Sequence, residues 1–424
     1  MLEISVLKAQ KDAVIKGLTD KQVKHASETV DQLLGLDEKR LSALRELEDS
    51  RMKMNSLSKS IGKLFKEGKR EEAQAARAET SSLKQRIKEL EKEMASYEEA
   101  QKELLVTLPN VPHVSVAIGK SPDDNVVVYS NDIEVSFSFE PKPHWELARM
   151  HDIIDWDLGS KITGAGFPVY KGKGARLQRA LIAFFLDEAH KAGYTEFMPP
   201  LMVNEASGFG TGQLPDKEGQ MYHVGLDNLY LIPTAEVPIT NLYRNVLLKA
   251  EDLPIKSCGY TPCFRREAGS YGKDVKGLNR LHQFDKVEIV QICHPDTSYE
   301  ALEEMVAHVS GLLDALELPY HKLLLCTGDM SFTSAKTYDM EVYSAGQGRW
   351  LEVSSISNFE TYQANRLKLR FKDGKKSRIL HTLNGSALAL PRIVAALLEN
   401  NQQADGSIRI PKVLQAYTGF DTIG

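Results

Sequence analysis

The sequence has 424 residues, of which 42% are hydrophobic and 26% are charged, and its formal net charge is −5. A chain of this length can bury a large core and form more than one domain, while its negative charge argues against a protein that coats nucleic acid indiscriminately. It has no run of about 18 apolar residues and no apolar stretch near the N-terminus, so we expect a cytoplasmic protein without membrane association.

The first extended pattern is a pair of proline-free stretches, 28–65 and 71–104, which predict two long helices. Apolar residues recur in both with the 3-4 spacing of a coiled-coil seam. The predicted seam consists of Leu44, Leu47, Met54, Ile61 and Phe65 in the first helix and Ala73, Ala76, Thr80, Leu83, Ile87, Leu90, Met94, Tyr97 and Leu104 in the second. With a turn at 67–69, the helices would form an antiparallel arm about 50–60 Å long, projecting from the rest of the protein because it buries only its own seam.

Basic residues concentrate toward the turn of this arm. Between 51 and 70 there are seven of them and a single acid, Glu67, which gives a local charge of +6. Most coiled coils are dimerising or spacer elements, and the charge pattern alone leaves that interpretation open. The alternative is an RNA-binding surface that contacts phosphates without reading bases. The candidate contacts are Lys59, Lys63, Lys66, Lys69 and Arg70, together with Arg51 and Lys53 in the wider patch.

A domain boundary is predicted next, because residues 107–126 contain three prolines and Gly119. We therefore expect an N-terminal domain at 1–108 and a second domain at 109–424. A short helix should open at His144. The glycine-rich stretch 159–174 lacks the spacing of a phosphate-binding loop and predicts ordinary turns.

The next two elements are a helix over 175–191 and a strand over 194–203. The helix carries Leu177, Leu181, Phe184 and Phe185 on one face. The two prolines at 199–200 should keep the strand at an edge or interface.

The most informative stretch is 260–290, which predicts two antiparallel strands joined by a long mobile loop over 269–277. Because side chains alternate along a strand, Arg265 and Glu267 should share one face of the first strand. Phe284, Lys286 and Glu288 should share one face of the second. Cations, an aromatic ring and two carboxylates would then line one surface.

The four cysteines point to no special chemistry. Cys258, Cys263, Cys293 and Cys326 form no C-x-x-C pair and have no clustered histidines. We expect reduced, buried thiols, with neither a zinc site nor a disulfide framework.

Two smaller patterns complete the candidate site. Thr234-x-Glu236, on an extended segment, would place a hydroxyl and a carboxylate on one side, although such a pair is common by chance. Further strands are predicted at 320–325, 337–343 and 350–355. In the last of these, Glu352 and Ser355 offer the oxygen ligands that hard divalent cations prefer.

The segments FRREAGSYG and GLNRLHQFDKVE closely resemble motif 2 of class II aminoacyl-tRNA synthetases, in the form found in bacterial-type seryl-tRNA synthetases. The resemblance covers essentially the whole chain. Residues 175–203 resemble motif 1, which builds the dimer in that family, and 382–399 resemble motif 3. It implies an α+β fold, with an antiparallel β-sheet flanked by helices and preceded by a long coiled-coil arm, in a homodimer.

The resemblance also implies a function. It is that of a serine–tRNA ligase, which converts L-serine and ATP to seryl-adenylate and diphosphate, then transfers serine to the 3′ end of tRNA(Ser) and tRNA(Sec) with release of AMP. The arm would grip the long variable arm of the tRNA, and Mg²⁺ would accompany ATP. Phe284 would stack on adenine, and Glu267 would accept a hydrogen bond from its amine.

Carried over residue by residue, the resemblance assigns serine contacts to Thr234, Ala235, Glu236, Glu288, Asn384 and Ser386. It assigns ATP contacts to Arg265, Arg266, Glu267, Leu281, Phe284, Glu352, Val353, Ser354, Ser355 and Arg392. Catalysis would fall to Arg265, Glu352 and Arg392, with Mg²⁺ held by Glu352 and Ser355. Motif 3 departs slightly from the family, which often has glycine at Ala387 and a small residue at Pro391, but proline is tolerated in the first turn of a helix.

Two other functions are compatible with parts of the sequence. An amino acid:carrier-protein ligase shares the catalytic fold but lacks the long arm. A non-catalytic RNA-binding paralogue would have lost Arg265, Glu267, Glu352 or Arg392, all of which are present.

Overall fold

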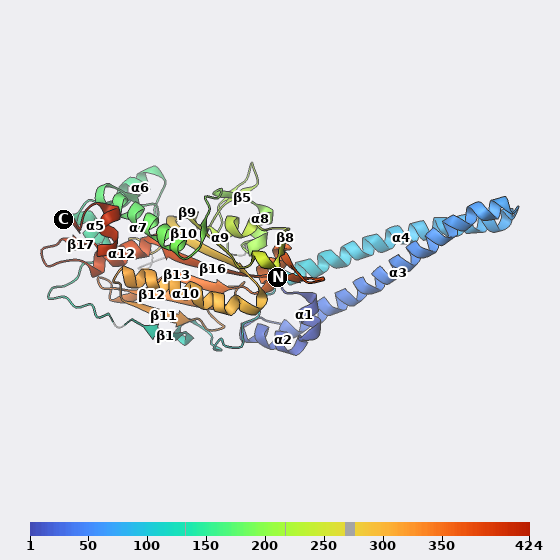
Figure 1. Ribbon diagram of the computed structural model, residues 1–424, viewed down its shortest axis with the longest axis horizontal. Helices are drawn as coiled ribbons and strands as arrows, with labels where there is room; N and C mark the ends of the chain where they lie inside the picture. The colour runs from blue at the N-terminus through green and yellow to red at the C-terminus, as the bar shows by residue number, and fades with distance from the viewer. Residues whose placement is uncertain (132, 217, 268–275) are drawn as a thin grey trace. The chain divides into compact units, whose positions relative to one another are not determined.

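The computed structural model describes residues 1–131, 133–216, 218–267 and 276–424. The chain divides into two compact units, Met1–Pro109 and Asn110–Gly424 (Figure 1). Most of the predicted loop over 269–277 lies outside the described residues. Within them, no helix is both long enough and apolar enough to cross a membrane.

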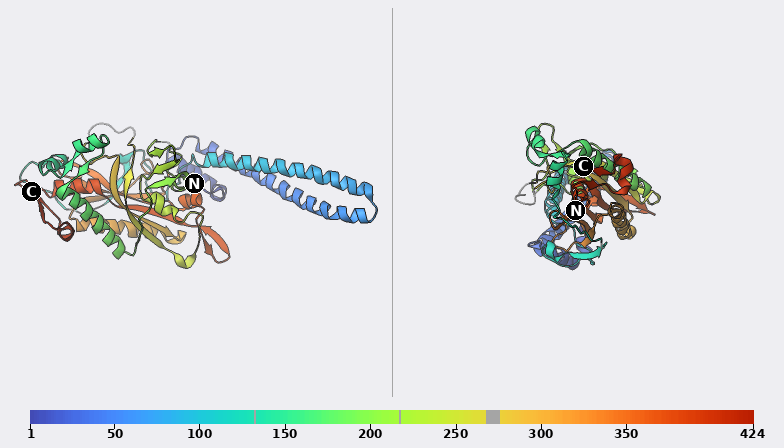
Figure 2. Two further views of the ribbon diagram at one scale, coloured as in Figure 1. Left: turned by 90° about the horizontal axis from the view of Figure 1, so that it is seen from above. Right: turned by 90° about the vertical axis from the view of Figure 1, so that its left-hand side faces the viewer.

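The first unit is entirely helical. Its helices are α1 (Ile4–Ala9), α2 (Lys11–Asp20), α3 (Ala26–Lys66) and α4 (Arg70–Leu105). The two long helices contain 41 and 36 residues and pack side by side in both views (Figures 1 and 2). Both agree with the predicted helices to within two residues, because an uninterrupted apolar seam and an absence of proline are local signals.

The seam of the arm is confirmed except at its distal end. Leu47, Ile87 and Leu90 form its buried centre. Phe65, however, is 42% exposed and lies under the guanidinium of Arg77, with 5.6 Å between the guanidinium carbon and the ring centroid. The seam instead passes through the neighbouring Leu64, which is partly buried. The 3-4 spacing in the sequence is compatible with either residue in the seam, and the packing of the two helices places Leu64 there.

Ion pairs also tie α3 to α4. Arg86 donates two hydrogen bonds to Glu46, at 2.7 and 2.9 Å. Arg51 pairs with Glu91 at 2.7 Å and Lys53 with Glu79 at 2.6 Å. Two of the seven basic residues counted toward the patch are therefore engaged across the seam, and the basic surface begins further along, at Lys59.

The second unit is built on an eight-stranded sheet with the order β1-β11-β12-β13-β16-β10-β9-β4. All neighbouring strands are antiparallel except β4 and β9, which are parallel. The strands are β1 (Val126–Ser130), β4 (Thr195–Glu196), β9 (Ile255–Phe264), β10 (Gln283–Cys293), β11 (Tyr320–Leu324), β12 (Lys336–Ser344), β13 (Arg349–Asn358) and β16 (His381–Ala389). This arrangement confirms the predicted fold class.

Helices cover both faces of this sheet (Figure 1). On one face, α7 (Gly172–Lys191), α10 (Ser298–Ala315) and α12 (Leu390–Asn400) bury their apolar sides in the main core. On the other, α9 (Glu236–Asn241) packs against Val290 of β10, and α8 (Glu205–Thr211) and α11 (Thr361–Leu367) lie beside it. The predicted face of α7 is confirmed, since Leu177, Leu181, Phe184 and Phe185 are all buried.

The remaining elements are short. Further helices are α5 (His144–Met150), α6 (Trp156–Ile162) and α13 (Lys412–Thr418), with 3-10 turns at Pro122–Asp124, Ala250–Asp252 and Pro295–Thr297. Small sheets are formed by β2 (Ile154–Asp155) with β3 (Val169–Tyr170), by β5 (Met202–Asn204), β7 (Leu229–Leu231) and β6 (His223–Val224), by β15 (Lys376–Ile379), β14 (Arg370–Asp373) and β8 (Leu247–Lys249), and by β17 (Ile408–Arg409) with β18 (Thr422–Ile423). The glycine-rich stretch thus contributes to α6, β3 and α7 rather than to turns alone.

The predicted strand over 194–203 is wrong as a single element. It is two strands in two different sheets, β4 beside β9 and β5 beside β7. The prolines at 199–200 lie in the segment that separates them, and proline cannot donate to a ladder. The predicted buried thiols are confirmed, because all four cysteines are free and buried.

A buried polar cluster connects α5, α12 and the turn between β12 and β13. His144 and Glu399 are fully buried, with 2.7 Å between Nδ1 and Oε1. Leu278 donates its backbone N–H to Nε2 of His144 at 2.8 Å, which leaves Nδ1 to donate to Glu399. Burial would raise the pKa of Glu399, but the hydrogen bonds from His144 and Ser344 hold it below its usual value.

Replacing His144 by leucine should therefore destabilise the second unit by about 3–5 kcal/mol, because it leaves a buried carboxylate short of a donor. Denaturant unfolding at pH 7 measures this, with His190→Leu on the exposed end of α7 as the control. A carboxyl with a lowered pKa stabilises the fold above its unfolded pKa and loses that effect as pH falls through the folded value. The difference between the two variants should thus shrink at acid pH, and a loss below about 1 kcal/mol at pH 7 would contradict this account.

Candidate active site

The candidate site is organised around β10, which lies between β9 and β16. Glu288 pairs with Gly259 on one side and with Ser386 on the other. Residues two apart on a strand share a face, so Lys286 and Glu288 lie on one face while Val287 and Ile289 enter the main core on the other. Asn384 and Ser386 of β16 share the face of Glu288, as their register requires.

Thr234 and Glu236 lie near this face, but they do not lie on the extended segment that was predicted. The segment is not extended, because Ala235 is α-helical and Glu236 is the first residue of α9. Thr234 instead makes a tight turn, in which its Oγ1 accepts from the N–H of Glu236 at 3.2 Å. Thr234 also donates to Glu288 Oε2 at 2.8 Å. The predicted hydroxyl and carboxylate are thus brought together with Glu288 by a helix start rather than by strand alternation.

Two carboxylates are buried in this part of the site, and each has its own partner. Glu288 forms an ion pair with Lys286, which also donates to Thr234 Oγ1 at 2.9 Å. Glu236 Oε1 accepts from the amide of Gln363 at 2.7 Å. Burial and the nearby Glu288 carboxylate raise the pKa of Glu236 to about 7. One of the two carboxylates is therefore neutralised by a cation, and the other is held by a neutral donor.

Phe284 lies near the start of β10, and Arg265 directly follows the last residue of the neighbouring strand β9. The guanidinium carbon of Arg265 is 5.2 Å from the ring centroid of Phe284, and its Nε donates to the carbonyl of Pro233 at 3.3 Å. The arginine is thus held between the aromatic ring and the segment that carries Thr234. The ring of Phe284, the guanidinium of Arg265 and the buried carboxylate of Glu288 therefore follow one another along the site.

Glu267 does not share a strand face with Arg265, because β9 ends at Phe264. Its φ of 47° is in the left-handed region, and its carboxylate accepts from Arg280 at 2.9 Å. Arg266 is exposed. The residues that follow, 268–275, lie outside the described part of the chain.

The other half of the site comes from β12, β13 and α12. Arg392, in the first turn of α12, donates from Nη1 to the backbone carbonyl of Glu352 at 2.6 Å and from Nε to that of Asn279 at 3.2 Å. Ser355 faces Asp339 across the strands. Burial and Glu352 raise the pKa of Asp339 well above its usual value. Pro391 lies in the first turn, as predicted, and leaves Arg392 directed at Glu352.

Four of the predicted contact residues have side chains that are used within the protein and are not offered to a ligand. Leu281 and Val353 are packed in the main core, and Ala235 packs against Ile239 and Val290. Ser354 donates to the backbone carbonyl of Ser386 at 2.5 Å. The first three can offer a ligand only their backbone atoms, and the last supports the strand that carries Ser386.

The sequence-based assignment missed Gln363 and assigned no role to Lys286. Lys286 could have been found from the two-residue period that identified Phe284 and Glu288. Gln363 lies in α11, far along the chain from Glu236, and no local pattern marks it. Its position depends on how α11 packs on the sheet.

The donor set near Glu352 suits a hard cation brought by phosphates. The carboxylate of Glu352 is half exposed. Ser355, on the same strand β13, offers a hydroxyl oxygen. Among the described residues, no cluster of three or more histidines, cysteines or acids is arranged to hold a metal ion. Magnesium usually takes one or two protein oxygens together with substrate phosphates, which these residues fit.

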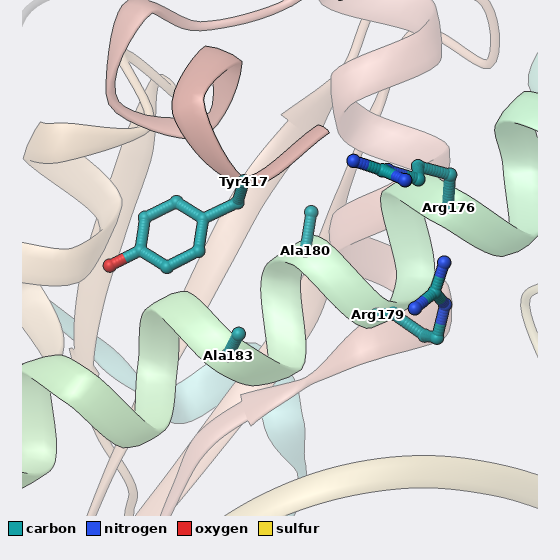
Figure 3. A pocket seen from close by; sticks show the side chains of 5 residues that line it. All are labelled: Arg176, Arg179, Ala180, Ala183 and Tyr417. Atoms are coloured by element: carbon teal, nitrogen blue, oxygen red, sulfur yellow. The ribbon is translucent and has the colours of Figure 1, made fainter. Parts of the chain in front are cut away.

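A separate pocket lies on the opposite side of the sheet, between α7 and α13. It is lined by Arg176, Arg179, Ala180, Ala183 and Tyr417, with both arginines on the same side of α7 (Figure 3). None of the residues assigned to serine or ATP contributes to it. It therefore does not belong to the candidate active site.

The site combines an arginine just beyond the end of β9, an aromatic ring and a buried carboxylate on β10, and a second arginine in the first turn of the helix that follows β16. In an antiparallel sheet, these features define the catalytic domain of a class II aminoacyl-tRNA synthetase. Residues 222–401 match the tRNA synthetase class II core domain (G, H, P, S and T). Residues 1–112 match the seryl-tRNA synthetase N-terminal domain.

The chain belongs to the seryl-tRNA synthetase family. It is 53% identical to the serine–tRNA ligase of Salinibacter ruber, covering 100% of this chain and 99% of that protein, and 46% identical to that of Chloroherpeton thalassium, with full coverage of both. The crystal structure of seryl-tRNA synthetase from Pyrococcus horikoshii complexed with ATP superimposes with a TM-score of 0.93 at 36% identity, covering 100% and 99% of the two chains. The predicted enzyme class, serine–tRNA ligase, is confirmed, and the two alternative functions are not supported.

Proposed function

We propose that this ligase activates L-serine with ATP in the pocket around Glu288 and transfers it to tRNA(Ser) and, by family resemblance, tRNA(Sec). The observation that carries the proposal is the position of Arg265, between the ring of Phe284 and the segment bearing Thr234. In the reaction, the α-phosphate of ATP must lie between adenine and the amino acid. Arg265 lies between the ring proposed to stack on adenine and the residues proposed to bind serine, so it is placed to contact that phosphate.

Serine would bind through charge and hydrogen bonds. Its ammonium group requires an acceptor, as does its hydroxyl, and Glu236, Glu288 and Thr234 provide these in a buried pocket. Ser386 and Asn384 close the same face from β16. Ala235 would contribute its backbone.

ATP would extend from Phe284 toward Arg392. The ring of Phe284 would stack on adenine, and Glu267 would accept from the exocyclic amine once Arg280 releases it. Arg266 and Arg392 would meet the outer phosphates, with Ser354 supporting the strand and with Leu281 and Val353 lining the site through their backbones. Arg392 is well supported for this role because two carbonyls hold its guanidinium.

Activation would proceed by attack of the serine carboxylate on the α-phosphate, with diphosphate as the leaving group. Negative charge grows on the phosphoryl oxygens, and Arg265 and Arg392 are placed to stabilise it without a covalent enzyme intermediate. Glu352 and Ser355 would hold Mg²⁺, which supplies further charge neutralisation at the phosphates. The ribose hydroxyl of the tRNA then attacks the seryl-adenylate, and AMP leaves.

The remaining assignments concern assembly and location. The motif 1 region, α7 with β4 and β5, would form a homodimer interface as in the family. The exposed basic residues Lys59, Lys63, Lys66, Lys69 and Arg70 would contact tRNA phosphates. The enzyme would act in the cytoplasm.

ATP–pyrophosphate exchange with several amino acids tests the proposal. Exchange should depend on serine and should remain near background with alanine, threonine and glycine. Equal exchange with another amino acid would contradict the assignment of the pocket.

A substitution at Arg265 tests the chemical step. Arg265→Ala should lower serine-dependent exchange by about 10²–10³-fold, because the lost cation matters most as charge develops. Arg409→Ala, which removes an exposed arginine paired with Glu317 at 2.7 Å, is the matched control and should stay within about twofold. Exchange by Arg265→Ala within about threefold of the unmutated enzyme would contradict the assignment.

A further inference from the structure

The two carboxylates of the serine pocket are neutralised unequally. Glu288 carries an ion pair with Lys286, which is itself 5% exposed. Among the described residues, the hydrogen-bond donor to the Glu236 carboxylate is the neutral amide of Gln363. The Lys286–Glu288 pair has no net charge, whereas the amide of Gln363 leaves the negative charge of Glu236 unneutralised when that carboxyl is ionised.

We infer that Gln363 is a positioning residue, which holds the carboxylate of Glu236 in place for the ammonium group of the amino acid. The inference rests on the proposed serine site. A cation is attracted to the carboxylate that lacks a cationic partner, and a neutral hydroxyl needs only an acceptor.

The geometry of Gln363 supports this role. Its Nε2 donates to Glu236 Oε1 at 2.7 Å and to the carbonyl of Thr211 at 3.1 Å. Its Oε1 accepts from Thr382 Oγ1 at 2.8 Å. Gln363 is 1% exposed, so its amide group is fixed from both ends and cannot rotate without breaking a hydrogen bond. Helix α11, β16 and the end of α8 thereby set the direction of one carboxylate on α9.

The electrostatics agree with the geometry. Burial and Glu288 raise the pKa of Glu236, while Gln363, Lys286 and Arg265 lower it. These are the charged and hydrogen-bonding groups that influence Glu236 from the packed elements. Removing the amide of Gln363 should raise the pKa of Glu236 further, so that less carboxylate is available to an ammonium group at neutral pH.

The test uses the full-length enzyme and compares Gln363→Met with Gln291→Met. Gln291 is also a fully buried amide, but it bonds to Tyr194 on the other face of the sheet, at 2.8 Å. Gln363→Met should raise the serine KM by about 10–100-fold in pyrophosphate exchange, leave the ATP KM within about twofold and shift the acid limb of serine KM to higher pH. Gln291→Met should leave the serine KM and its pH profile unchanged even where stability falls.

A double-mutant cycle isolates the action through Glu236. In the Glu236→Gln background, Gln363→Met should add less than about twofold to the serine KM, because the group that it positions is already altered. If Gln363→Met fails to fold, Thr382→Val should show a smaller effect in the same direction.

Two results distinguish a failure of the proposed function from a failure of the positioning role of Gln363. Absence of serine-dependent exchange in the unmutated enzyme would refute the proposed function and, with it, this inference. Normal exchange in the unmutated enzyme with an unchanged serine KM in Gln363→Met, or additive effects in the cycle, would refute only the positioning role.

Discussion

Replacing Glu288 by alanine is expected to reduce serine activation severely and to narrow the preference for serine over alanine, which can reach about 10⁴–10⁵-fold in sites of this kind. The reason is that Glu288, 1% exposed, offers a buried acceptor. When alanine binds, that acceptor and its partners have no substrate hydroxyl to satisfy them. We therefore expect alanine to be rejected at the activation step.

The measurement is kcat/KM for serine and for alanine in pyrophosphate exchange. Because Glu288→Ala leaves Lys286 buried beside Thr234 without its ion pair, Glu288→Gln provides a second variant that keeps the shape and an acceptor but removes the charge. Glu304→Ala, an exposed acid paired with Lys256, is the matched control. If a Glu288 variant keeps its activity and its ratio of kcat/KM for serine to that for alanine is unchanged, another residue must bind the substrate hydroxyl.

Deleting Asp49–Ala95 is expected to abolish transfer to tRNA while leaving serine activation intact. The deletion removes the distal part of α3 and α4, whose seam is internal to the arm. It leaves the polar cluster at the base of the unit, where buried Asp37 is bonded to Arg40 at 2.8 Å and to Gln101 at 3.3 Å. Loss of adenylate formation together with charging would show that the arm is not an independent RNA-binding element.

A charge-reversal variant tests the same surface without a deletion. Changing Lys63, Lys66, Lys69 and Arg70 to glutamate should lower tRNA affinity by at least about 10³-fold, since each lost phosphate contact costs about 1 kcal/mol or more. It should also flatten the dependence of binding on salt, because fewer counterions are released. Reversal of Lys39, Arg45, Lys88 and Lys92, which are exposed on the same two helices away from the turn, is the control. Equal losses in both variants would refute a specific surface near the turn.

The long helices of the arm and most of the catalytic strands could be predicted because their signals are local. A helix such as α3 needs only a repeated apolar seam without proline, and β9 and β10 follow from alternation around a loop. The motif resemblance then related Arg265, Glu288 and Arg392 to one function. One error arose within the arm, where the 3-4 spacing allowed either Phe65 or Leu64 to occupy the seam.

The sequence by itself therefore determined the arm and the class of catalytic domain, and it supplied most of the residues that we propose to contact the substrates. Tertiary structure alone decided that 194–203 serves two sheets, that Glu236 begins a helix, and that Gln363 supports it across 127 positions of the chain. The physical reason is that secondary structure follows from neighbours within a few residues, whereas the direction of a buried carboxylate depends on donors supplied by elements packed against it. Those donors are set by how α8, α11 and β16 pack together, which no local periodicity records.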